Sequence, residues 1–148
     1  MSKQYPPGTA YHEAGHAVVG WSFGLRVGGV RVSDNDSSGT AEIDGAEHLP
    51  LVDQIAIRFA GVAAEAVFGH PTHELIASGD RQEVMKLLAA HGVFEHNGDA
   101  RKLRDLGYRN AKERLEKNRD KVIALAEWLV IHGEIKEADM RALLLGRE

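Results

Sequence analysis

Apolar residues recur along the chain at the three- and four-residue spacing of helices, and this pattern dominates the sequence. It predicts helices over about 10–23, 51–68, 80–96 and 99–132, and a short last helix that contains Met140, Leu143 and Leu144. The 51–68 segment is almost wholly apolar, so we expect it to be the central helix of the core. Gly107 lies inside the longest segment, where it could introduce a kink.

Residues that start and stop helices flank these segments. Thr9 is expected to cap the first helix, and Gly24 is expected to end it. Ser78-Gly79 precede the third predicted helix, and Asn97-Gly98 follow it. The third helix should therefore begin at about Asp80.

The segment between the first two helices has the pattern of strands instead. Valines alternate with glycines and arginines in RVGGVRV at 26–32, a turn-rich DNDSSG follows, and TAEID at 40–44 alternates again. We expect a small hairpin or sheet here. The fold class is therefore α+β, mostly α, and we expect residues 1–148 to form a single domain.

Composition narrows the chemistry that is open to the chain. Hydrophobic residues make up 43% and charged residues 27% of its 148 residues, as in ordinary globular proteins. There is no cysteine, which excludes disulfides, iron–sulfur clusters and thiolate metal sites, so that any metal must bind His, Asp or Glu. No stretch is long and apolar enough for a membrane span, and no signal peptide is visible, so we expect a cytoplasmic protein.

One part of the chain is basic although the net charge is −4. Residues 99–121 carry 9 Lys and Arg against 5 Asp and Glu. The acids are interleaved with the bases, which favours a solvated helix with i,i+4 ion pairs over a nucleic-acid-binding surface. We therefore expect no nucleic-acid partner.

The motif that carries chemistry is HExxH, formed by His12, Glu13 and His16 in the first predicted helix. Residues four apart share a helix face, so both imidazoles can point at one zinc ion. Glu13 would then lie beside the metal, where its carboxylate can take a proton from a metal-activated water. The alternative is that both histidines lie on the surface of an ordinary amphipathic helix. The apolar residues around the motif indicate a buried helix instead, and buried imidazoles and carboxylates need polar or metal partners.

The residues leave the third ligand open. The extended pattern HExxHxxGxxH is excluded, because Val19 and Ser22 stand at its glycine and third histidine positions. Glu65 lies in an apolar segment and should meet a cation, the metal or a metal-bound histidine. Asp80 could be a ligand or only an acid in the first turn of a helix. His70, His73, Tyr5 and Tyr11 are candidates for the donor that stabilises an oxyanion.

Several blocks together resemble the zinc peptidase domain of FtsH-type membrane-bound AAA+ proteases. They are AYHEAGHAVVG at 10–20, RVGGVRV with SSGTAEID, FAGVAAEAVFG at 59–69, ASGDRQEV at 77–84 and the closing segment 124–144. The resemblance implies that His12, His16 and Asp80 bind zinc and that Glu13 is the catalytic base. It also implies that Glu65 orients a ligand imidazole.

The chain also departs from that family. It has no GxxxxGK motif followed by Ser or Thr, so we expect a stand-alone peptidase domain without the ATPase module, and Val62 stands where the family usually has Arg. The resemblance implies a zinc endopeptidase acting on peptides or unfolded proteins, whose partner could be a separate ATPase or another copy of the chain. The missing phosphate-binding motif implies that the activity of this chain is independent of ATP. Its substrate would pair with the strand at Gly39 and Thr40. The alternative is a catalytically silent binding or regulatory module with structural zinc.

Overall fold

The computed structural model of the chain describes residues 4–33, 39–72, 74–94 and 98–146, and it has the expected α+β, mostly helical class. The elements of these ranges, in chain order, are α1 (Pro7–Ser22), β1 (Arg26–Val32), β2 (Gly39–Asp44), the short 3₁₀ helix η1 (Ala46–His48), α2 (Leu51–Phe68), α3 (Glu74–Ala90), α4 (Gly98–Lys117), α5 (Arg119–His132), β3 (Glu134–Lys136) and α6 (Glu137–Leu144). Among the described helices, none is both long enough and apolar enough to cross a bilayer.

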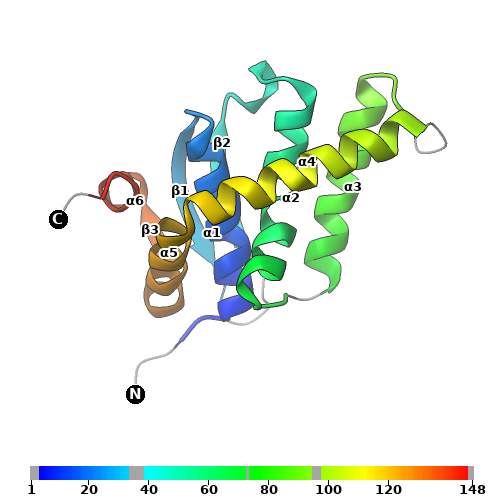
Figure 1. Ribbon diagram of the computed structural model, residues 1–148. Helices are drawn as coiled ribbons and strands as arrows, with labels where there is room; N and C mark the ends of the chain where they lie inside the picture. Colours follow the sequence, from blue (N-terminus) through cyan, green and yellow to red (C-terminus); the bar gives the residue numbers. More distant parts are fainter. Residues whose placement is uncertain (1–3, 34–38, 73, 95–97, 147–148) are drawn as a thin grey trace.

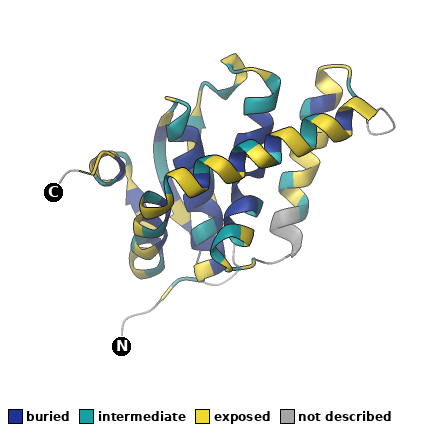
Figure 2. Ribbon diagram, viewed as in Figure 1, coloured by how far each residue is buried: buried dark blue, intermediate teal, exposed yellow. Residues whose placement is uncertain are grey.

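Helix α1 lies at the centre of the molecule, between α2 on one side and the sheet on the other (Figure 1). Nearly every residue from Gly8 to Gly20 is buried, so α1 has no broad solvent face. Figure 2 shows α1 and the middle of α2 mostly in the colour of buried residues, whereas the outer side of α4 is exposed. A motif on α1 is therefore placed in the core and can reach solvent only through a cleft.

The strands form an antiparallel sheet in the order β2-β1-β3. The predicted hairpin is confirmed as β1 and β2, in which Val30 pairs with Ala41 and Val32 with Gly39. The register shifts between Val27 and Val30, where two glycines lie. The third strand, β3, was not predicted, because three residues are too few to show an alternating pattern. In this order β2 is an edge strand.

Small residues allow α1 and α2 to pack at very short range. A Cβ atom added at Gly15 would lie 2.6 Å from both the carbonyl oxygen of Ala60 and the Cβ of Ala64. Such atoms normally stay more than 3 Å apart, so the two backbones could not approach this closely with any side chain at Gly15.

The predicted 51–68 helix is confirmed with the same bounds, as α2.

The boundaries of α1 and α3 differ from the prediction. Thr9 does not cap α1: the helix begins at Pro7, where proline is favoured because its missing N–H would be unpaired anyway, and Thr9 is buried inside it. Helix α3 begins at Glu74, so Ser78 and Gly79 are helical and Asp80 lies within the helix. Gly79 accepts a helical conformation, and no atom of the described residues lies within 4 Å of a Cβ added there. The helix ends at Ala90, and Asn97 lies outside the described residues.

The predicted helix over 99–132 is two helices, and Gly107 lies inside the first of them, α4, which continues through this position. The chain breaks between α4 and α5 at Asn118, whose backbone leaves the helical conformation. Gly107 serves packing instead, since a Cβ there would lie 2.4 Å from Cγ2 of Ile55 on α2. It allows α4 to cross α2 closely (Figure 1).

We predict that Gly15→Ala destabilises the protein by about 1–3 kcal/mol, because overpacking at the α1–α2 contact outweighs the better helix propensity of alanine. Urea unfolding of the purified variant measures this change. The matched control is Gly79→Ala on α3, where an added Cβ meets nothing within 4 Å. That variant should gain about 0.5–1 kcal/mol from helix propensity alone. Equal effects of the two substitutions would contradict the packing explanation.

Candidate metal centre

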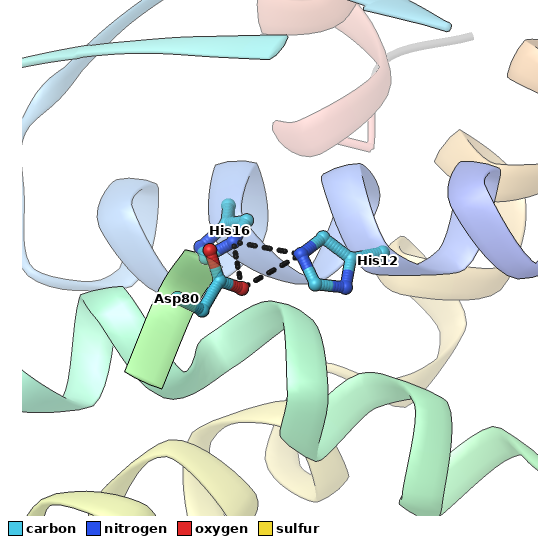
Figure 3. A group of neighbouring side chains, drawn as sticks. All are labelled: His12, His16 and Asp80. Atoms are coloured by element: carbon cyan, nitrogen blue, oxygen red, sulfur yellow. Dashed lines mark hydrogen bonds and ion pairs between the residues drawn. The ribbon is translucent and has the colours of Figure 1, made fainter. Parts of the chain in front are cut away.

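Two helices bring the three candidate metal ligands together. His12 and His16 project from the same face of α1, and Asp80 reaches them from α3 (Figure 3). The side chains are 1%, 14% and 21% exposed respectively. Asp80, although it lies inside α3 and not at its start, is therefore close to both histidines.

The Nδ1 atom of each imidazole is held by a separate acceptor on α2. His12 Nδ1 lies 2.6 Å from Oε2 of Glu65, and His16 Nδ1 lies 2.8 Å from the carbonyl oxygen of Ile57. A carbonyl oxygen can only accept, so the proton of neutral His16 is on Nδ1, and the Glu65 carboxylate favours the same tautomer of His12. Both Nε2 atoms then direct lone pairs toward one point, as metal ligation requires.

The distances between the ligand atoms fit a metal ion. The two Nε2 atoms are 3.3 Å apart, and Oδ2 of Asp80 lies 2.7 Å from Nε2 of His12 and 3.2 Å from Nε2 of His16. Ligands at zinc distances in a tetrahedron are separated by about 3.3 Å. His12, His16 and Asp80 could therefore hold such an ion with little movement, and the donor set of two imidazoles and a carboxylate is one that zinc accepts.

Gly61 on α2 provides the space for the His12 ring. A Cβ at this position would lie 2.4 to 2.6 Å from three atoms of the imidazole, Nε2 included. No sequence pattern indicates this role, because a glycine inside an apolar helix looks like a packing residue. Any larger residue at Gly61 would displace the ring from its position opposite Asp80.

Glu65 is fixed at both carboxylate oxygens. Its Oε2 contacts His12, and its Oε1 accepts the backbone N–H of Thr72 at 2.7 Å. Burial raises the pKa of Glu65, but these hydrogen bonds outweigh it and hold the pKa below its ordinary value. Glu65 is therefore an ionised partner of His12 and lies on the side of the ring away from Asp80.

The ligand residues interact strongly with each other. Burial lowers the pKa of His12, but the hydrogen bonds to Asp80 and Glu65 outweigh burial and raise it to about 9. Burial also raises the pKa of Asp80, and the bonds to His12 and His16 more than reverse this, so that it falls well below its usual range. Negative charge thus gathers around His12, which attracts a proton or a metal cation.

Glu13 lies beside the ligands and has a different environment. It is only 5% exposed, and burial raises its pKa above the ordinary value. Glu13, His16 and Asp80 line one cavity of about 340 Å³, which also includes Ala41 and Ile43 of β2. The Glu13 carboxylate can therefore meet a molecule that enters this cavity. The sequence analysis expected substrate at this strand, at Gly39 and Thr40, but did not identify Ala41 and Ile43 as the β2 residues that line the cavity.

The other polar candidates lie elsewhere. The rings of Tyr11 and His70 stack on each other with centroids 4.5 Å apart, and Tyr5 packs against Gly133. Within the described residues, none of the three lines the cavity beside Glu13. His73 lies outside the described residues.

We predict that Asp80→Ala loses most bound metal, because it removes the only carboxylate among the three converging ligands of the described site. Glu65→Gln should keep the metal but bind it about 10- to 100-fold more weakly, since the His12 ring loses its charged partner. Metal content after dialysis against a weak chelator distinguishes the two. If the Asp80 variant kept its metal in full and the Glu65 variant lost it, Glu65 would be the ligand and Asp80 the residue that orients His12.

Metal binding should also release a proton. Between the ordinary histidine pKa and about 9, His12 carries a proton that must leave Nε2 before this atom can bind a metal. Calorimetric titration of metal-free protein with zinc, in buffers of different ionisation enthalpy, should give about one proton released at about pH 8. Release of no proton there would contradict the raised pKa of His12.

The sequence profile of a family described as Peptidase M50B-like matches residues 8–94. This segment contains His12, Glu13 and Asp80 and makes up more than half of the chain. No curated protein matches the chain significantly. The profile supports a metallopeptidase-like family without singling out the FtsH-type proteases, and the chain therefore belongs to the peptidase M50B-like family.

Proposed function

We propose that the chain is a zinc endopeptidase of the FtsH-like kind, with His12, His16 and Asp80 as zinc ligands. The observation that carries the proposal is the convergence of Nε2, Nε2 and Oδ2 within 4.8 Å of one another, next to a cavity that Glu13 also lines. Membership of a metallopeptidase-like family and the FtsH-like sequence blocks support the same function.

A zinc ion at this position supplies a Lewis acid that activates water and polarises a peptide carbonyl. Glu13 is the general base: it takes the proton of the attacking water and passes it to the nitrogen of the leaving amine. Its burial supports this role, because a raised pKa brings a carboxylate closer to the pH at which it must both accept and return a proton. Glu65 and the carbonyl of Ile57 hold the two imidazoles in place throughout.

The edge strand β2 is the proposed binding site for an extended substrate. Its hydrogen-bonding edge opposite β1 has no strand partner within the described residues, and its inward-facing Ala41 and Ile43 line the cavity with Glu13. A peptide that adds to this edge as a further strand is held by main-chain hydrogen bonds, so binding would depend little on its sequence. Such pairing requires an extended chain, which favours peptides and unfolded segments as substrates.

The same proposal includes a biological context. Access to folded proteins would depend on unfolding by a separate ATPase or on an assembly of several copies of the chain. We propose a cytoplasmic setting without a nucleic-acid partner. The competing function is a binding or regulatory module in which the metal is structural, and the buried carboxylate of Glu13 favours the enzyme, since a structural metal needs no base beside it.

The decisive experiment replaces Glu13 by Gln. Glu13→Gln keeps the size of the side chain and removes the base, so zinc content and fold should persist while hydrolysis of casein falls by roughly 10² to 10⁴. The measurement combines metal analysis, circular dichroism and release of fluorescent fragments from labelled casein. The regulatory function would be supported instead if zinc-loaded wild type and variant were equally inert toward unfolded proteins and peptides.

A further inference from the structure

The side chain of Glu13 occupies the space where residue 39 would have its own side chain. A Cβ built on Gly39, the first residue of β2, would lie 2.7 Å from Cγ of Glu13 and 3.2 Å from its Cδ. Carbon atoms in contact normally stay about 3.5–4.0 Å apart. Glu13 could not keep its position beside the metal ligands if Gly39 carried even one methyl group.

The backbone conformation at position 39 does not require a glycine. Its φ angle does not lie in the positive range that favours glycine, so a residue with a side chain could adopt the same backbone conformation. It lies in a regular strand and pairs with Val32 of β1. The requirement for glycine at this position is therefore one of space.

The inward-facing residues of β2 increase in side-chain size along α1. Gly39, Ala41 and Ile43 alternate with exposed residues and face inward, from no side chain to a large one. At the far end the relation reverses, since a Cβ at Gly20 of α1 would lie 3.0 Å from Cγ2 of Ile43. At one end a large residue of α1, Glu13, lies against a glycine of β2, Gly39. At the other end a large residue of β2, Ile43, lies against a glycine of α1, Gly20.

We propose that Gly39 is a positioning residue for Glu13: the missing side chain leaves a slot on β2 that holds the carboxylate facing the cavity. This inference rests on the proposed function in one respect, namely that Glu13 acts as a base. The slot itself is a property of the packing. Among the atoms around a new Cβ, the Glu13 side chain can rotate away most easily, so the carboxylate is the group that would move.

A second close neighbour must be separated from this effect. The same added Cβ would lie 2.8 Å from the carbonyl oxygen of Arg31 on β1, so Gly39→Ala also strains the sheet. Gly29→Ala on β1 is the control for a methyl group added to the same sheet without a clash: its Cβ would lie 3.4 Å from the carbonyl oxygen of Ile135 and from Oε2 of Glu42, and it has no close contact with Glu13. The clash with Arg31 itself is separated by a double-variant cycle.

The first measurement is kinetic. Gly39→Ala should lower kcat for an unfolded substrate at least about tenfold, because the base is displaced, while KM and zinc content stay within about twofold of wild type. Gly29→Ala should leave all three unchanged. A normal kcat in Gly39→Ala, or a loss that appears only in KM, overturns the proposal.

The second measurement does not depend on activity. Urea unfolding of Gly39→Ala, Glu13→Ala and the double variant forms a cycle in which Glu13→Ala removes the atoms that collide with the new Cβ. The destabilisation by Gly39→Ala should be at least halved in the Glu13→Ala background. If the two effects are additive, the contact with the Arg31 carbonyl oxygen accounts for the whole destabilisation by Gly39→Ala, and the proposal is overturned.

Each outcome also separates the two proposals. If wild type is inert but the cycle is non-additive, the peptidase function fails and the slot for Glu13 stands. If wild type is active but the cycle is additive, the function stands and the slot fails. Should Gly39→Ala not fold alone, its rescue by Glu13→Ala supports the slot, and failure of that rescue overturns it.

Discussion

Helices α1 and α2 approach each other so closely that Gly15 of α1 and Gly61 of α2 have no room for a side chain. Gly15 of α1 faces backbone atoms of α2, and Gly61 of α2 faces the His12 ring. At this distance α2 can supply Glu65 and the carbonyl of Ile57 to the two imidazoles. The candidate metal centre thus depends on helix packing, because the groups that orient the two imidazoles are parts of the neighbouring core helix.

The sequence predicts the ligands on α1 better than it predicts the rest of the site. The HExxH spacing places His12 and His16 on one face whatever surrounds the helix, since this depends only on local geometry. The position of Asp80 depends on how α3 packs, and spacing along the chain does not contain that information. Gly39 and Gly61 matter through contacts with residues far away in the sequence, which no local pattern reveals.

The errors in the fold have related physical causes. Turn residues such as Ser78 and Gly79 are only weakly unfavourable in a helix, and at an exposed position their cost of roughly 1 kcal/mol is easily offset by the packing of the rest of α3. The packing role of Gly107 was not predicted, because its contact with Ile55 lies outside any local window. The 51–68 helix was predicted with its correct bounds because an apolar run of that length, bounded by Pro50 and Gly69, has few alternatives.

The held imidazoles also bear on which cation the site selects. Nδ1 of each ring is bonded to α2, so a ring that moved apart to surround a larger ion would lose this hydrogen bond; in the structure the two Nε2 atoms are 3.3 Å from each other. Calcium takes six to eight oxygen ligands at about 2.3–2.6 Å, and magnesium prefers an octahedron of oxygens. Two nitrogen donors at fixed, short separation serve neither ion well. A metal held at this candidate site would therefore be a transition metal rather than one of the more abundant hard cations, and the selectivity would come from the packing of α1 against α2.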